Sequence, residues 1–125
     1  MPVGQIARLV AKPGCRDQAI EILQKCFDTI AEEQGNLLYV MLSDKRSVVT
    51  RLAEDGREER TEESYPDEIW FMEIYTDEAA LEEHDARYDT VPLLRDEVMP
   101  GLAPLLAEPY ELIRANVVRA KGLDA

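Results

Sequence analysis

Apolar residues recur along the first third of the chain with the spacing of a helix. Between residues 15 and 34 they repeat at i, i+3 and i+4, which predicts one helix with a single buried stripe. The stripe consists of Ala19, Ile22, Leu23, Cys26, Phe27, Ile30 and Ala31. Asp17 favours the start of this helix electrostatically, and Gly35 is a natural end for it.

Four shorter apolar runs predict strands, because each has the length of a strand and turn or polar residues border it. They span residues 5–11, 36–43, 67–76 and 110–119. Thr76 is a good N-cap for a second helix that continues to about Tyr88. A further short helix is predicted for residues 91–99.

The order of these elements, β-α-β-β-α-β, is that of a split βαβ sheet. We therefore expect an α+β, ferredoxin-like fold in one domain that spans residues 1–125. A highly charged insert at residues 44–66 interrupts this order. Within it, residues 47–53 and 57–61 flank Glu54-Asp55-Gly56, which allows either a protruding hairpin or a solvated loop.

The second and third strands of the predicted sheet are apolar on both of their faces. Side chains alternate between the faces of a strand, and here both alternating sets are apolar. One set comprises Leu38, Val40, Leu42, Trp70, Met72 and Ile74. Since the helices of this topology cover one face only, the simplest cover for the other is a second copy of the chain. We expect a homodimer whose two sheets form a shared α/β barrel.

The composition excludes several classes of partner. The 125 residues include 26 acidic and 14 basic ones, a net charge of −12, whereas proteins that bind nucleic acids or anionic membranes present basic patches. No apolar run approaches the roughly 18 residues that a membrane span needs. We therefore expect neither nucleic acid nor a membrane as a partner.

The cysteines and the first residues favour a cytoplasmic location. Cys15 and Cys26 lie in the same predicted helix, roughly 16 Å apart along its axis, which is too far for a disulfide. The chain begins without the basic segment and apolar segment of a signal peptide. With one histidine and two cysteines in the chain, no metal-binding Cys/His set is available, and no metal site is expected.

His84, the only histidine, is the candidate for acid–base chemistry. It shares a helical face with Leu81 and Tyr88, so we expect it to point inward. An imidazole titrates near neutrality, which suits a general base that removes a phenolic proton. A core histidine held by one hydrogen bond is the alternative.

Aromatic and methionine side chains could line a ligand pocket, because such pockets are mostly apolar with a few polar groups. The candidates are Tyr39, Trp70, Tyr75, Tyr88 and Tyr110, with Met41 and Met72. Packing in the core or at a dimer interface is the alternative for each of them.

Three polar residues, Arg8, Arg114 and Asn116, fall within apolar strands. An arginine in such a place needs a partner. The partner is either an acid such as Glu73 or Glu111, or an anionic group of a bound substrate, for which Arg114 and Asn116 are the candidates.

Two stretches resemble the signature of the antibiotic biosynthesis monooxygenases and the related small quinol monooxygenases. RLVAKPG at residues 8–14 leads into the first helix, and FMEIYTDEAALEEH at residues 71–84 runs from a strand through a helix start to a histidine. By this resemblance, His84 corresponds to the family's helix histidine, Glu73 to its strand acid, and Tyr75 to the aromatic residue two places later.

The sequence also departs from the family pattern. A second histidine that many members have falls near Asp89 and is absent. In the haem-degrading branch, an asparagine would fall on Ala7 and a catalytic tryptophan on His84, so the resemblance disfavours haem degradation.

The resemblance implies a dimeric barrel with a pocket between sheet and helices, and oxygenation without metal, flavin or haem. The hypothesis is a cofactor-independent monooxygenase that acts on a small aromatic or polycyclic phenol or quinol, with O₂ as co-substrate. His84 would accept the proton, and Trp70, Tyr75 and Tyr88 would form the pocket wall. The alternatives are a non-catalytic dimeric barrel that binds a small molecule, and an isomerase or cyclase that uses the same cavity.

Overall fold

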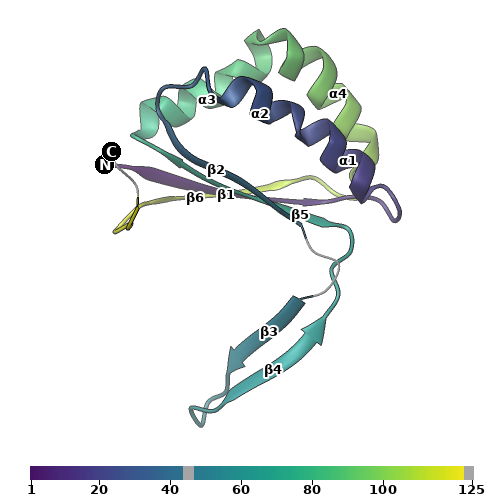
Figure 1. Ribbon diagram of the computed structural model, residues 1–125, viewed down its shortest axis with the longest axis vertical. Coiled ribbons are helices and arrows are strands. Elements are labelled where there is room, and N and C mark those ends of the chain that lie inside the picture. Colours follow the sequence, from purple (N-terminus) through teal and green to yellow (C-terminus); the bar gives the residue numbers. More distant parts are fainter. Residues whose placement is uncertain (44–46, 123–125) are drawn as a thin grey trace.

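Four strands pair into one antiparallel sheet in the order β2-β5-β1-β6 (Figure 1). In this computed structural model, which describes residues 1–43 and 47–122, they are β1 (Val3–Val10), β2 (Asn36–Ser43), β5 (Glu68–Tyr75) and β6 (Glu111–Asn116). Without the insert, the sheet order is 2-3-1-4 in the sequence of its strands. This is the split βαβ sheet, and the predicted ferredoxin-like α+β fold is confirmed.

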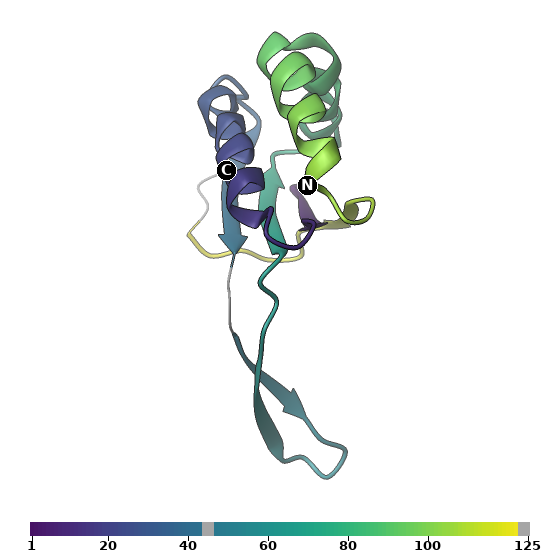
Figure 2. The ribbon, with the colours of Figure 1, turned by 90° about the vertical axis from the view of Figure 1, so that its right-hand side faces the viewer.

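The helices pack together on one face of the sheet (Figures 1 and 2). They are α1 (Arg16–Leu23), α2 (Lys25–Ile30), α3 (Glu78–Thr90), the π-helical turn η1 (Leu93–Val98), α4 (Met99–Leu102) and the 3₁₀ turn η2 (Ala103–Leu105). The single helix predicted for residues 15–34 is divided at Gln24. There the N–H of Phe27 bonds to the carbonyl three residues back, at 3.1 Å, so the turn tightens and α2 begins.

Asp77, and not Thr76 as predicted, caps the N-terminus of α3. The Asp77 carboxylate accepts a hydrogen bond from the N–H of Ala80 at 2.8 Å. The N–H of Thr76 bonds instead to the carbonyl of Gly35 at 2.9 Å, which ties the end of β5 to the start of β2. The helix predicted for residues 91–99 is observed as η1 and α4, after Pro92.

The two faces of the sheet differ in how they are covered. The face toward the helices carries buried side chains, among them Ala7, Leu9, Ile69 and Phe71. The opposite face, which we call the open face, carries apolar side chains that stay partly exposed: Ile6 at 40%, Met72 at 43%, Leu42 at 47% and Ile113 at 56%. The prediction that the strands are apolar on both sides is confirmed, and within the described chain no helix covers the open face.

The charged insert contains the hairpin that was one of its two predicted forms. β3 (Ser47–Leu52) and β4 (Glu58–Glu63) pair in a separate two-stranded sheet, and Gly56 with φ +85° makes the turn between them. This ribbon, which we call the arm (residues 47–63), projects away from the helices on the side of the open face (Figures 1 and 2). Residues 44–46 of the predicted insert lie outside the described residues.

Cys15 and Cys26 are both free thiols, as their spacing predicted. Cys26 is buried in the core, and burial raises the pKa of its thiol. No helix within residues 1–43 and 47–122 is both long enough and apolar enough to cross a membrane.

Gly35 lies where the start of β2 meets α3, and a side chain there has no room. A Cβ atom on Gly35 would lie 2.4 Å from the Cβ of Ala80. We expect Gly35→Ala to lower the free energy of unfolding by about 1–3 kcal/mol, measured by chemical denaturation. Gly4→Ala is the matched control, because its new Cβ would meet its nearest neighbour at 3.7 Å. Equal stability of the two variants would contradict the expectation.

Candidate functional site

A cavity of about 300 Å³ lies between the helix-covered face of the sheet and the helices. Apolar side chains from the sheet and from the helices form most of its wall, including Leu23, Phe71, Val98 and Leu102. Its polar side chains are Gln5, Glu73, His84, Asp85 and Arg114, in addition to tyrosines. A mostly apolar wall with a few polar groups is the usual composition of a small-molecule site.

His84 projects from α3 into the interior and is held between two carboxylates. Its Nδ1 lies 2.8 Å from Oε1 of Glu33, and its Nε2 lies 3.4 Å from Oε1 of Glu73. All three side chains are almost fully buried. Glu73 and His84 line the cavity.

Glu73 is the centre of a hydrogen-bond network that follows the cavity wall. It accepts hydrogen bonds from the hydroxyl of Tyr75 at 2.7 Å and from Nε2 of Gln5 at 3.2 Å. The side-chain oxygen of Gln5 accepts in turn from Nε of Arg114 at 2.6 Å, and Arg114 binds both oxygens of Asp85 at 2.8 and 2.9 Å. The network fixes the orientation of the acid that faces His84.

The two contacts of His84 constrain where its protons lie. If the imidazole is neutral and donates from Nδ1 to Glu33, its Nε2 lone pair faces a carboxylate oxygen of Glu73. Two acceptors then oppose each other at 3.4 Å, and a proton between them satisfies both. The Glu33–His84–Glu73 row can therefore hold a proton at the cavity wall and pass it along the row.

A positive charge lies behind this row. Nε of Arg87 is 3.5 Å from Oε2 of Glu33, and its guanidinium also pairs with Glu32 at 2.8 Å. Because the Arg87 side chain is mostly buried, its charge acts on Glu33 with little screening by water.

Three tyrosines surround His84 and stay protonated at ordinary pH. The ring centroids of Tyr75 and Tyr88 lie 5.2 and 5.4 Å from that of His84, and that of Tyr39 lies 6.2 Å away. Burial raises the pKa of all three phenols far above the usual value. Their hydroxyls are therefore neutral donors in the site.

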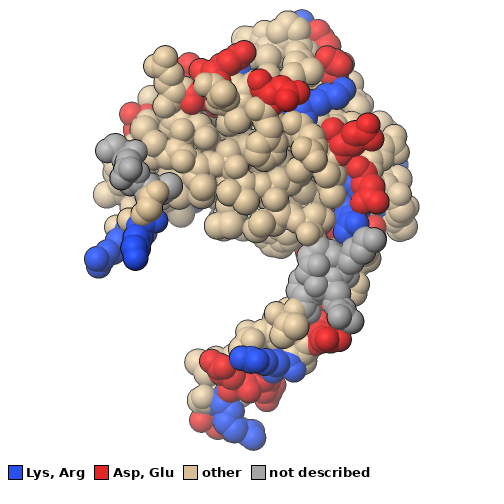
Figure 3. Space-filling model, in the orientation of Figure 1, with Lys and Arg blue, Asp and Glu red and all other residues tan. Residues whose placement is uncertain are grey.

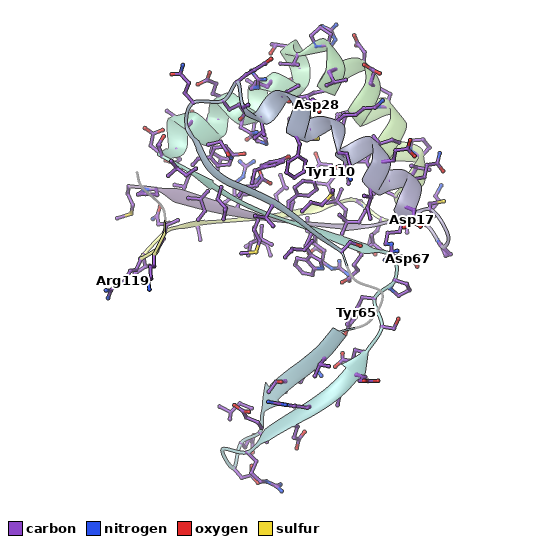
Figure 4. All side chains as sticks on the ribbon, in the orientation of Figure 1. Asp17, Asp28, Tyr65, Asp67, Tyr110 and Arg119 are labelled. Atoms are coloured by element: carbon purple, nitrogen blue, oxygen red, sulfur yellow. The ribbon has the colours of Figure 1, made fainter. Side chains whose placement is uncertain are left out.

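The structure brings together most of the predicted site residues. His84, Tyr39, Tyr88 and Arg114 all line the cavity. Tyr75 is fully buried beside them and bonds to Glu73. Tyr110, another of the predicted aromatic residues, also lines the cavity and lies between sheet and helices (Figure 4). Met41 packs against the core and is not part of the cavity wall.

Trp70, Met72 and Asn116 are not part of this cavity. Trp70 and Met72 flank Phe71 on β5, and because successive side chains of a strand alternate, they point to the open face. There Nε1 of Trp70 donates to Glu68 at 3.3 Å, and the guanidinium of Arg8 lies 6.0 Å from its ring. Asn116 is the last residue of β6, opposite Val3, and is exposed beyond the cavity.

The arginine partners were predicted in part. Arg8 binds Glu68 at 2.5 Å and also lies 3.8 Å from Glu111, one of the two predicted acids. Glu73, the other, bonds to Tyr75 and Gln5 instead of an arginine. Arg114 points to the helix-covered face of the sheet, opposite to the face that carries Arg8, and forms an ion pair with Asp85 of α3.

Sequence reasoning missed Glu33, Gln5 and Asp85. Glu33 belongs to a polar run at the end of the predicted helix, and nothing in that run distinguishes it from a surface acid. Gln5 did carry a signal, because it alternates with Val3, Ala7 and Leu9 and so occupies an inward position of its strand. Within residues 1–43 and 47–122, no group of three or more His, Cys, Asp or Glu side chains is arranged to hold a metal ion.

Comparison with known proteins gives the same family as the sequence pattern. The family model for "antibiotic biosynthesis monooxygenase" matches residues 2–88. The comparison with curated proteins finds no significant match.

Solved structures of the same fold cover nearly the whole chain. A candidate antibiotic biosynthesis monooxygenase from Chloroflexus aurantiacus J-10-fl is 25% identical, with a TM-score of 0.63 over 99% of this chain and 100% of that one. Rv0793 from Mycobacterium tuberculosis is 22% identical, with a TM-score of 0.61 over 96% of this chain and 98% of that one. A further candidate monooxygenase, from Caulobacter crescentus CB15, is 15% identical, with a TM-score of 0.69 over 94% and 91% of the two chains.

The match to the family model spans well over half of the sequence and includes His84 and both of its carboxylate neighbours. The chain therefore belongs to the antibiotic biosynthesis monooxygenase family.

Proposed function

We propose that this protein is a cofactor-independent monooxygenase that takes a small aromatic phenol or quinol into its cavity and uses O₂ as co-substrate. The observation that carries the proposal is the buried Glu33–His84–Glu73 row, of which His84 and Glu73 line a mostly apolar cavity. Such a site combines a buried proton acceptor with an apolar surface that can bind an aromatic ring.

The chemistry begins with removal of the phenolic proton. His84, with Glu73, accepts this proton, and the resulting phenolate is electron-rich enough to react with O₂ directly. In the conversion of a phenol to a quinone, one oxygen atom becomes the new carbonyl oxygen and the other leaves as water. The substrate supplies all four electrons, so the reaction balances without a further reductant.

The cavity suits a small aromatic substrate. Its volume of about 300 Å³ is at the lower end of ligand pockets, which favours a substrate of one or a few fused rings. Tyr39, Tyr88 and Tyr110 offer ring faces and hydroxyl donors for stacking and orientation. Arg114 is already paired with Asp85, so the wall has no excess positive charge to attract a carboxylate. These features support a substrate that enters as a neutral phenol.

We propose further that the working unit is a homodimer joined through the open face. Ile6, Leu42, Met72 and Ile113 expose much of their apolar surface there. Burying an apolar side chain of this size fully is worth about 1.5–3 kcal/mol, so covering the face with the same face of a second copy supplies a large favourable term.

Oxygen uptake tests the proposed reaction. Purified, metal-stripped protein is incubated with a panel of phenols and quinols, and O₂ consumption and quinone formation are followed together. We expect stoichiometric consumption of O₂ with at least one bicyclic phenol. Turnover that continues without oxygen would indicate an isomerase or cyclase, and a thermal shift without any turnover would indicate a binding protein; either result would overturn the proposal.

Glu33 is expected to act as a positioning residue for His84. Glu33→Gln removes the negative charge at Nδ1, and we expect it to lower kcat by about ten- to a hundredfold and to shift the pH profile of kcat/KM. Its exposed neighbour Glu32 provides the control variant Glu32→Gln. A loss of activity with no change in the pH profile, or an equal loss in both variants, would argue for a purely structural role.

A further inference from the structure

The arm is a two-stranded ribbon that stands clear of the sheet and the helices (Figures 1 and 2). Within the arm, Arg51 and Thr61 bind Glu63, which also accepts a hydrogen bond from Tyr65 at the base of the arm. A two-stranded hairpin by itself is only marginally stable in water. The arm therefore gains stability from any surface on which it can pack.

One side of the arm carries exposed apolar side chains. Val48 is 65% exposed and Leu52 is 74% exposed, and because they are four residues apart on β3 they point the same way. Both strands of the ribbon are also edge strands, with unpaired backbone groups along their outer sides. Side chains and backbone alike are suited to contact with another protein surface.

The arm and the open face border the same concave space (Figures 1 and 3). A six-residue strand is about 20 Å long, and stacked sheets lie about 10 Å apart. An arm of this length reaches past the sheet of any second copy that covers the open face. The occupant that both surfaces fit is thus another copy of this chain.

Charge decides which part of the second copy the arm meets. The arm contains six acidic and three basic residues, whereas the C-terminal tail (residues 117–122) contains Arg119 and Lys121, and one acid, Asp124, follows it in the sequence. Arg119 lies across the concave space from the base of the arm, which Tyr65 marks (Figure 4). A two-fold axis can bring the arms together, with like charge opposed, or can bring each arm to the tail of the other copy, with opposite charge paired.

We propose that the arm of each copy clasps the second copy and contacts its basic C-terminal tail. This proposal rests on the homodimer proposed above, and it gives the charged insert a function in assembly. Val48 and Leu52 supply apolar contact in the clasp, and the acidic strand β4 supplies the charge that pairs with Arg119 and Lys121 of the other copy.

A charge swap measured by sedimentation equilibrium tests the clasp. The arm variant carries Glu58→Lys, Glu59→Lys and Glu62→Lys, and the tail variant carries Arg119→Glu and Lys121→Glu. We expect each variant alone to dimerise about tenfold more weakly than the wild type, because the two-fold axis makes every substitution count twice. An equimolar mixture of the two is expected to recover the wild-type affinity, since arm and tail are then of opposite sign in both contacts.

Matched controls change the same number of charges on the helix layer. The control for the arm variant carries Glu21→Lys, Glu82→Lys and Glu83→Lys, and the control for the tail variant carries Lys25→Glu and Arg95→Glu. Each control is expected to dimerise with the affinity of the wild type.

Wild-type affinity in the tail variant would overturn the clasp, because a dimer in which the two arms contact each other is not affected by charges in the tail. A wild type that is monomeric would overturn the homodimer as well, whereas oxygen uptake reports on the proposed reaction separately. Val48→Ser with Leu52→Ser, which leaves the charge unchanged, is expected to weaken the dimer too.

Discussion

Replacing His84 by glutamine is expected to lower the rate of phenol-dependent oxygen uptake by about 10²- to 10⁴-fold, the usual contribution of a positioned general base. Glutamine can keep a hydrogen bond to Glu33 or Glu73, but it cannot take up the substrate's proton. The loss should appear mainly in kcat, because the apolar wall that binds the ring is unchanged. Steady-state kinetics with an oxygen electrode measures both constants.

A second variant separates chemistry from folding. His84→Ala leaves Glu33 and Glu73 without their shared partner and is expected to be less stable than the wild type. If the imidazole is the proton acceptor, added imidazole should restore part of the activity of this variant by occupying the vacated space. Full activity in His84→Gln, or no response of His84→Ala to imidazole while the protein remains folded, would contradict the assigned role.

Raising the pH from 9 to 11 is expected to lower the free energy of unfolding by about 4 kcal/mol, since each of three buried tyrosines contributes about 1.4 kcal/mol per pH unit above pH 10. Burial raises the pKa of Tyr39, Tyr75 and Tyr88 in the folded chain, whereas in the unfolded chain these phenols ionise near pH 10. Above that pH the folded state binds more protons than the unfolded state, so stability is complete below pH 10 and is lost as the pH rises. Urea denaturation at a series of pH values measures this slope.

Tyr88→Phe provides the check on this slope. The hydroxyl of Tyr88 lies 3.9 Å from Sγ of Cys26, a weak contact, so its removal disturbs the core little. We expect the loss of stability between pH 9 and 11 to shrink by about one third, or about 1.4 kcal/mol. An absorbance titration that shows all three phenols ionising in the folded protein would contradict the expectation.

Much of the fold follows from local patterns in the sequence. The period of the apolar positions predicted the helical segment between residues 15 and 34, and short apolar runs predicted each strand of the sheet to within a few residues. The absence of apolar–polar alternation in two of these runs also predicted that the second and third strands of the sheet are apolar on both faces. Such features depend on neighbours along the chain, so they can be deduced without knowing the tertiary structure. The capping of α3 by Asp77 instead of Thr76 depends on the exact φ and ψ at the end of β5.

The sequence predicted only those features of the site that depend on a single helix or strand. His84 was expected to point inward because its helical face is apolar, and it does so. Trp70 and Met72 were expected in the pocket for their residue type, but strand alternation turns them to the other face of the sheet. The alternation was already visible in the sequence; which of the two faces the helices would cover was not.

The sequence by itself determined the order of the elements, the two-sided apolar sheet and the single histidine available for acid–base chemistry. Only the tertiary structure decided that Glu33, 51 residues from His84 along the chain, and Glu73 would hold the imidazole between them. It also decided that the charged insert stands away from the sheet as an arm. The physical reason is that both features depend on how segments distant in the sequence lie relative to one another. The residue pattern of each segment alone carries no information about that placement.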